Sequence, residues 1–179
     1  MSAEASLGSF RYAILSDPAC LDGFSCGERS IDRRISNCCE QHSIYKSRLI
    51  CIFTARDPKA IGFYCLSAHG LQSNAFDQSE KEKKDWAGLV PFIYINYLAV
   101  RKDVQNRRVG SSLLVNALKR CAIFADNVGL FGVALNALND RVAVFYQKRG
   151  FSQRGDASSP FMILPTQTLL DMFGPNPGS

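Results

Sequence analysis

The segment RRVGSSLL, residues 107–114, contains residue types that could bind an anion. The first turn of a helix carries backbone N–H groups without intrahelical partners and the positive end of the helix dipole. Small residues at positions 110–112 would let a phosphate reach those N–H groups, and the two arginines could add charge-assisted hydrogen bonds. The segment therefore predicts an anion site, with three candidate explanations: a phosphate-bearing cofactor, a nucleic acid, or simply a solvated helix start. It is neither GxxxxGK[ST] nor GxGxxG.

The distribution of charge also allows an anionic partner. Lysine and arginine number 21 against 16 aspartates and glutamates, a net charge of +5. The basic residues gather in groups rather than spreading evenly, which favours an anionic ligand over scattered solvated side chains without excluding the latter. Outside the segment above, the groups nearest the N-terminus are Arg29, Arg33 and Arg34, followed by Lys46 and Arg48.

Composition excludes several other classes of protein. With 179 residues, 46% hydrophobic and 21% charged, the chain is typical of one globular domain. No apolar run approaches the ~18 residues of a membrane span. The first residues do not form a signal peptide, so we expect a cytoplasmic protein. The seven cysteines show no CxxC pair or Cys/His cluster, so we expect reduced structural thiols and no metal. His42 and His69 are isolated, and we assign them no role.

The elements that must position the anion site follow from hydrophobic periodicity. Apolar positions at helical spacing predict a helix over 109–125, directly after a continuous apolar strand at 91–100. Asn139 is a predicted N-cap for a helix that ends at Gly150. The remaining predicted elements are a strand at 10–15, a helix at 30–42 with Ser30 as N-cap, hairpin strands at 48–55 and 60–68, and strands at 129–137 and 161–164. This order predicts an α/β fold with a mixed sheet.

The stretches YLAVRKDVQNRRVGSSLL and NDRVAVFYQKRGF together resemble the GCN5-related N-acetyltransferases, or GNAT family. The family's acetyl-CoA loop has the form [Q/R]-x-x-G-x-[G/A], which Arg107, Gly110 and Ser112 match. Serine replaces glycine or alanine at the last position, and Asn106 and Arg108 stand where many members have glycine. The resemblance implies a mostly antiparallel mixed sheet with a splayed central strand, in a single domain over 1–179 with a core at 9–165 and a C-terminal tail at 166–179.

Upstream, LDGFSCGERSIDRRISNCCEQH resembles the N-terminal part of GNAT toxins from type II toxin–antitoxin modules. The resemblance implies acetylation of the α-amino group of aminoacyl-tRNA, and so a block of translation. It also implies a homodimer and a ribbon-helix-helix antitoxin as partner. The basic groups named above, from Arg29 to Arg48, become the candidates for binding tRNA.

The resemblance further assigns residues to acetyl-CoA. The strand end would bind the pantetheine arm and acetyl carbonyl, the loop the pyrophosphate, and Asn139 the CoA arm. The candidates before Asn139 are Leu98, Ala99, Val100, Gln105, Arg107, Arg108, Val109, Gly110, Ser111 and Ser112. Tyr146 would be the general acid that protonates the CoA sulfur, although without the resemblance it reads as a core tyrosine beside Phe145.

The sequence offers no convincing general base. That favours an α-amine, whose pKa near ~8 leaves a neutral fraction at pH 7, over a lysine amine near ~10.4. Two alternatives stay open: a GNAT enzyme acting on a small amine or a protein N-terminus, and a non-catalytic module that binds acetyl-CoA.

Overall fold

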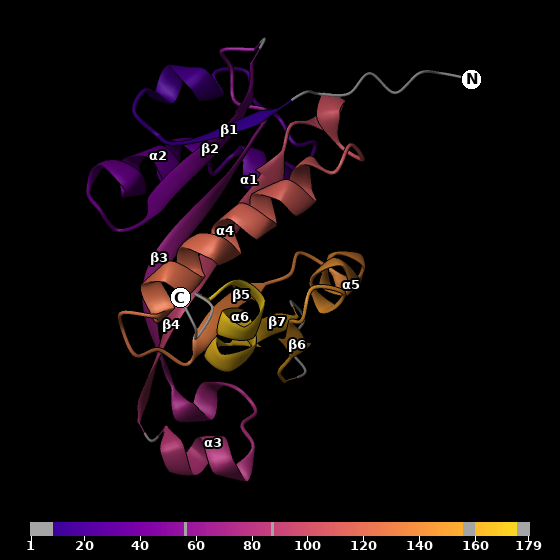
Figure 1. Cartoon of the computed structure of the whole chain (residues 1–179). Helices are drawn as coiled ribbons and strands as arrows, with labels where there is room; N and C mark the ends of the chain where they lie inside the picture. Colours follow the sequence, from indigo (N-terminus) through magenta and orange to yellow (C-terminus); the bar gives the residue numbers. More distant parts are fainter. Residues whose placement is uncertain (1–8, 56, 87, 156–159, 175–179) are drawn as a thin grey trace. The chain divides into compact units, whose positions relative to one another are not determined.

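The computed structural model describes residues 9–55, 57–86, 88–155 and 160–174 (Figure 1). Short 3-10 helices at Pro18–Leu21, Ser73–Ala75 and Lys102–Val104 join the longer elements. The strands are β1 (Phe10–Ile14), β2 (Arg48–Thr54), β3 (Gly62–Gln72), β4 (Leu89–Val100), β5 (Gly132–Asn136), β6 (Ser152–Gln153) and β7 (Phe161–Pro165). The helices are α1 (Arg29–Asp32), α2 (Ile35–Ser43), α3 (Glu80–Asp85), α4 (Val109–Ala125), α5 (Asp140–Gln147) and α6 (Thr166–Phe173).

The chain divides into two compact units, and β3, β4 and α4 contribute residues to both. Unit 1 comprises the chain up to Leu66 together with Tyr97–Val115, and unit 2 comprises Ser67–Asn96 together with the chain from Asn116 onward. The strand order is β1-β2-β3-β4 in unit 1 and β3-β4-β5-β7-β6 in unit 2. The pairs β1–β2, β2–β3, β5–β7 and β6–β7 are antiparallel, whereas β4–β5 is parallel. The expected mixed, mostly antiparallel sheet is confirmed.

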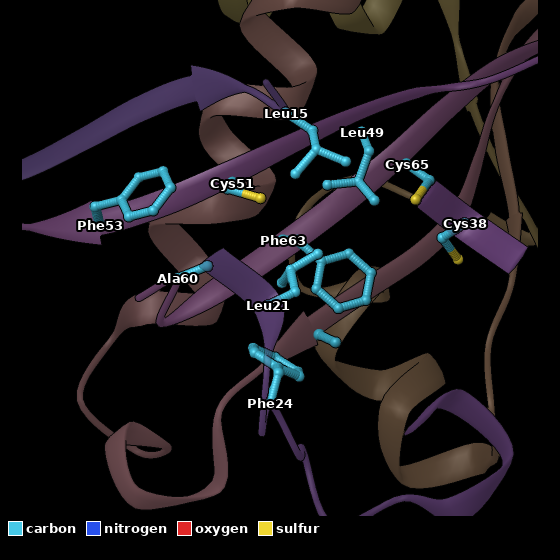
Figure 2. Close-up of a cluster of buried hydrophobic side chains, with 11 residues drawn as sticks. Leu15, Leu21, Phe24, Cys38, Leu49, Cys51, Phe53, Ala60, Phe63 and Cys65 are labelled. Carbon is cyan, nitrogen blue, oxygen red and sulfur yellow. The ribbon is translucent and has the colours of Figure 1, made fainter. Parts of the chain in front are cut away.

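Unit 1 has a core between its strands and the segment from residue 15 to α2. Phe24 and Phe63 meet edge to face with ring centroids 5.2 Å apart, and Leu49 is fully buried (Figure 2). Cys38 on α2 and Cys65 on β3 lie in the same cluster, where a free thiol behaves as a small hydrophobe. All seven cysteines are free thiols, as the sequence predicts.

Unit 2 has an aromatic core. Phe76, Phe92 and Phe131 pack with centroid distances of 5.2 to 5.6 Å, and Trp86 lies 5.8 Å from Phe131. Because Phe76 and Trp86 belong to the connection between β3 and β4, this connection packs against the core of unit 2. Arg154 reinforces it with two 3.1 Å hydrogen bonds to the Glu82 carboxylate on α3.

The predicted helix at 30–42 is wrong in two respects. It is divided into α1 and α2, because the N–H of Arg34 bonds to the carbonyl of Ile31 at 2.8 Å and tightens the turn between them. Its N-cap is Glu28 rather than Ser30: the Glu28 carboxylate accepts from the N–H of Ser30 at 3.2 Å and from its hydroxyl at 2.8 Å.

The C-terminal segment expected as a tail contains a helix. Residues 166–173 form α6, in which Leu169 is completely buried. The N–H of Gly174 donates to the carbonyl of Leu170 at 2.7 Å and closes the end of the helix. The hydroxyl of Thr166 anchors its start by bonding to the carbonyl of Leu130 at 2.8 Å. Residues 175–179 lie outside the described part. Among the described residues, no helix is long and apolar enough to span a membrane.

Candidate functional site

The loop that leaves β4 is fixed at its first residue. The guanidinium of Arg101 donates to Asp57 at 2.8 Å and to Asp103 at 2.7 Å and 3.0 Å. The hydrogen bond from Arg101 is the main reason that the pKa of the Asp103 carboxyl is lowered. The loop therefore starts from a rigid point before it reaches the two arginines.

The side chain of Gln105 links this loop to two neighbouring backbone segments. Its side-chain amide donates to the carbonyl of Val100 at 2.9 Å and to the carbonyl of Cys26 at 2.8 Å. Both amide hydrogens are therefore engaged with the backbone, one at the end of β4 and one in the turn before α1. The sequence assigns Gln105 to the cofactor. The structure gives its side chain a bracing contact, which leaves the carbonyl oxygen of the amide as its remaining polar atom.

Asn106 and Arg108 adopt the left-handed backbone conformation, with φ of 63° and 62°. This conformation favours glycine, the residue that many members of the resembled family have at these two positions. Asparagine tolerates it well, whereas an arginine adopts it at an energetic cost. The backbone thus keeps the conformation that glycine would give, and both side chains are exposed.

The start of α4 provides a place for a phosphate group. The N–H of Ser112 bonds to the carbonyl of Arg108 at 3.0 Å, so Arg108 is the residue from which the helix starts. The N–H groups of Val109 and Gly110 therefore precede the first intrahelical bond. A Cβ added to Gly110 would meet only Val100 Cγ2, at 3.6 Å, among atoms within 4 Å. The exposed Arg107 and Arg108 lie beside these N–H groups, and together they could bind a phosphate.

The two serines of the first turn are half-buried. The hydroxyl of Ser112 is hydrogen-bonded to the phenol of Tyr12 on β1, whose pKa is raised by burial. Ser111 is likewise half-buried, and the side chain of Val109 is buried in the core. These contacts hold the first turn of α4 in place, so its backbone is the part that can meet a ligand.

The end of β4 carries the three residues predicted to bind the pantetheine arm. Ala99 is buried, and Leu98 and Val100 are half-buried. In unit 2 the parallel register between β4 and β5 ends at the pair Tyr94–Ala134, although both strands continue. The strands part there, which agrees with the expected splayed central strand.

Tyr146 lies on α5 in unit 2, and its side chain is 7% exposed. Phe145 and Phe151 surround its ring edge to face, at centroid distances of 5.2 Å and 5.5 Å. Burial raises the pKa of Tyr146 to about 12, and the nearby Arg149 opposes that shift. The phenol is consequently protonated at every physiological pH and can act as a proton donor but not as a base.

Asn139 is the N-cap of α5, as predicted. Its side-chain oxygen accepts a hydrogen bond from the N–H of Val142 at 3.0 Å. The backbone at Asn139 is extended, and the residue is exposed. The cap accounts for the side-chain oxygen, and a contact between Asn139 and the CoA arm stays a prediction.

The basic residues predicted to bind RNA all belong to unit 1. Arg29 is in α1, and Arg33 and Arg34 lie at the break between α1 and α2. The three arginines therefore do not share one continuous helix, and their side chains do not follow the angular spacing of a single helix. Arg29, Arg33, Arg34 and Lys46 are exposed, and Arg48 is half-buried.

Asp32 stabilises the Ser-Cys-Gly turn that precedes α1. Its carboxylate accepts from the N–H of Cys26 at 2.9 Å and from the hydroxyl of Ser25 at 2.7 Å, which closes the turn before α1. Burial alone would raise the pKa of Asp32, but these hydrogen bonds outweigh it and the pKa is lowered. Asp32 was not among the predicted site residues, although the Ser-Cys-Gly turn and a carboxylate six residues after Cys26 form a recognisable pair.

The structure thus gathers the predicted residues from Leu98 to Ser112 in unit 1, together with the five basic residues. Asn139 and Tyr146 belong to unit 2. The cofactor, RNA and catalytic roles of all these residues stay predictions.

A family model described as an acetyltransferase (GNAT) domain matches residues 47–153. The protein is therefore an acetyltransferase, and the chain belongs to the GNAT family. The match runs from the start of β2 through the loop, α4 and Tyr146 to β6, so it includes every segment predicted to bind acetyl-CoA.

Two relatives are described as toxins. The chain is 36% identical over 137 residues to a tRNA-acetylating toxin of Mycobacterium tuberculosis strain H37Rv, covering 74% of this chain and 78% of the relative. It is 24% identical over 160 residues to a probable toxin, TacT, of Sinorhizobium fredii strain NGR234, covering 84% of this chain and 87% of the relative.

Solved structures share the fold. AtaT complexed with acetyl-methionyl-tRNAfMet superposes with a TM-score of 0.80 at 22% identity, over 92% of this chain and 99% of that one. A variant of KacT, with one tyrosine changed to phenylalanine, gives a TM-score of 0.82 at 23% identity over the same shares.

Proposed function

We propose that this acetyltransferase moves the acetyl group of acetyl-CoA to the α-amino group of an amino acid esterified to tRNA, and so blocks translation. The observation that carries the proposal is the 36% identity to the tRNA-acetylating toxin of Mycobacterium tuberculosis, which spans 74% of this chain. An acetylated α-amine cannot act as the nucleophile in peptide bond formation, so the product cannot accept a growing chain on the ribosome.

Acetyl-CoA supplies an activated acetyl thioester to this reaction. The residues of this chain that would hold its pyrophosphate are Arg107, Arg108 and the first N–H groups of α4. The lack of a side chain at Gly110 and the exposure of Arg107 and Arg108 beside the start of α4 support that assignment. The main-chain groups of Leu98 to Val100 would bind the pantetheine arm and the acetyl carbonyl.

Tyr146 would give a proton to the departing thiolate. A phenol whose pKa is about 12 is fully protonated at neutral pH. A thiol has a reference pKa near ~8.5, which apolar surroundings raise, because they disfavour the thiolate just as they disfavour the phenolate. The aromatic rings of Phe145 and Phe151 provide such surroundings at Tyr146.

The acceptor amine does not need a dedicated base. The α-amine has a pKa near ~8, so a neutral fraction on the order of a tenth exists at pH 7 and water can take the proton after attack. The exposed arginines of α1 and its junction with α2, with Lys46 and Arg48, would hold the tRNA through its phosphates. Such contacts position the substrate without reading its sequence.

The proposal extends to partners and organisation. We propose that the chain is a single acetyltransferase domain, works in the cytoplasm as a homodimer, and is neutralised by a ribbon-helix-helix antitoxin. The structures of AtaT bound to the C-terminus of the antitoxin AtaR, and of KacTA with DNA, support a partner of this kind.

The test is transfer of labelled acetyl from acetyl-CoA into a pool of charged tRNA, with deacylated tRNA, polyamines and peptides in parallel reactions. We expect label only in charged tRNA, and a loss of about 10²- to 10⁴-fold in Tyr146→Phe. Gln147→Ala, an exposed change on the same helix, is the matched control and should transfer normally. Label in polyamines or peptides, with charged tRNA unlabelled, would refute the substrate while leaving the family intact.

A further inference from the structure

Tyr45 stands on the surface between α2 and β2. Its side chain is 80% exposed, the largest exposed fraction among the exposed large hydrophobic residues that the structure describes. An exposed aromatic ring gains nothing from burial in the fold and is free to contact a partner. Lys46 and Arg48, predicted to bind RNA, are close to this tyrosine in the sequence.

The backbone at Tyr45 makes this choice of residue more unusual. The N–H of Lys46 bonds to the carbonyl of Gln41 at 3.0 Å, and the N–H of Tyr45 bonds to the carbonyl of His42 at 3.2 Å. This pair of bonds is a Schellman motif, in which the residue at the position of Tyr45 is left-handed and usually glycine. Tyr45 has a φ of 60°. A tyrosine is strained there, so the fold itself does not select it.

The surroundings of Tyr45 are basic. The guanidinium carbon of Arg48 lies 5.1 Å from the centroid of the tyrosine ring, and Lys46 is exposed next to it. Arg48 is half-buried on β2, so it steadies one side of the ring from the sheet. The neighbouring helix α2 contributes a single carboxylate, Glu40, which is exposed. An exposed ring flanked by cations is suited to an anionic partner that carries flat, apolar groups.

Nucleic acid with unpaired bases has this chemistry. Aromatic side chains stack on single-stranded bases of any sequence, while neighbouring lysine and arginine side chains contact the phosphates. Strained residues that persist against their local cost gather at sites of function. We infer that Tyr45 is a stacking platform for an unpaired nucleotide of the tRNA substrate, with Lys46 and Arg48 holding the adjoining phosphates. This inference rests on the proposed function.

The test measures the dissociation constant of the full-length protein for fluorescein-labelled deacylated tRNA over a series of KCl concentrations. Tyr45→Ala should raise the dissociation constant by roughly 5- to 100-fold at every salt concentration, because stacking is not an ionic contact. Tyr45→Phe keeps the ring and should bind within about twofold of the wild type. Lys46→Ala is the matched control, and it should lower the slope of log affinity against log salt by about 1.

A second variant separates a binding role from a structural one. Tyr45→Gly removes the strain, so its melting temperature should rise by about 2–4 °C while its RNA affinity falls as in Tyr45→Ala. Unchanged RNA affinity in Tyr45→Ala would overturn the inference. A loss in Tyr45→Phe equal to that in Tyr45→Ala would also overturn it, because the hydroxyl and not the ring would then be the contact.

These outcomes are separate from those of the proposed function. If wild-type protein acetylates charged tRNA but Tyr45→Ala binds tRNA normally, only the inference about Tyr45 fails. If wild-type protein binds tRNA through Tyr45 but acetylates polyamines instead, the proposed substrate fails and the stacking platform stands.

Discussion

Replacing Arg108 with glycine should make the protein more stable and its cofactor binding weaker. Arg108 holds a φ of 62° with an exposed side chain at the start of α4. A residue with a Cβ in this conformation costs about 1 kcal/mol relative to glycine. Glycine therefore removes strain from the folded state. It also increases the conformational entropy of the unfolded chain, which offsets part of this gain.

The change in melting temperature and the change in the dissociation constant for CoA can both be estimated. For a chain of 179 residues, about 1 kcal/mol corresponds to about 2–4 °C in melting temperature, so after the entropic offset we expect a rise below that range's upper end. Loss of the guanidinium removes a hydrogen bond to a charged phosphate, which is worth about 1.5–3 kcal/mol. That corresponds to a dissociation constant for CoA about 10- to 150-fold higher.

Arg108→Ala separates the two effects, because it removes the guanidinium and keeps the Cβ. It should bind CoA as weakly as Arg108→Gly but melt close to the wild type. Calorimetric titration with CoA and thermal unfolding of the three proteins measure both quantities. Equal melting temperatures for Arg108→Gly and Arg108→Ala would refute the strain at this position. Wild-type CoA affinity in both variants would refute the assignment of Arg108 to the pyrophosphate.

Three further predictions concern other parts of the molecule. Gln105→Ala breaks two hydrogen bonds, of 2.8 Å and 2.9 Å, and should lower the free energy of unfolding by about 1–2 kcal/mol, measured by urea denaturation. Gln105→Glu should be no more stable than Gln105→Ala, because its carboxylate lacks the NH2 group that donates both bonds. Burial acts to raise the pKa of Glu82, but hydrogen bonds from Ser79 and Arg154 leave it lowered, so the ion pair stabilises the fold above the unfolded-state pKa and this contribution is lost as pH falls. Arg154→Ala should therefore be less stable than the wild type by about 1 kcal/mol at pH 7, and a difference that stays constant down to pH 3 in thermal unfolding would contradict the pair. Because the pKa of Tyr146 is about 12, the initial rate of acetyl transfer should rise with deprotonation of the α-amine and stay level to pH 10, and a descending limb below pH 10 would argue against this tyrosine as the acid.

Much of the scaffold follows from local patterns in the sequence. The apolar positions from Val109 to Ala122 repeat at helical spacing, and α4 occupies the predicted bounds of 109–125. Asn139 is a side chain that caps helices well, and it caps α5. The two apolar runs on either side of Asp57 form the β2–β3 hairpin, and both runs are buried continuously, over Leu49–Phe53 of β2 and Gly62–Cys65 of β3.

One helix and one helix break were missed. The helix α6 is short and begins after Pro165, and the burial of Leu169 and the hydrogen bond from Thr166 to Leu130 stabilise it. The break between α1 and α2 comes from a local hydrogen bond, from the N–H of Arg34 to the carbonyl of Ile31 at 2.8 Å. Neither contact leaves a periodic pattern in the sequence.

The site was predictable in its residue types and less so in their conformations. The arginines and small residues before α4 indicate an anion site, and the structure adds that Asn106 and Arg108 take the backbone conformation of glycine. The bracing role of Gln105 depends on its contact with Cys26, far away in the sequence. The exposure of Tyr45 depends on how α2 ends, which the residue types alone do not determine.

The most direct test of the central claim identifies the atom that receives the acetyl group. Charged tRNA is treated with the protein and acetyl-CoA, the aminoacyl ester is hydrolysed with mild base, and the released amino acids are analysed by mass spectrometry. The account predicts free amino acids acetylated on the α-nitrogen, absent when Tyr146→Phe replaces the wild type. Acetyl groups that remain on the RNA after ester hydrolysis, or no acetylated amino acid at all, would contradict it.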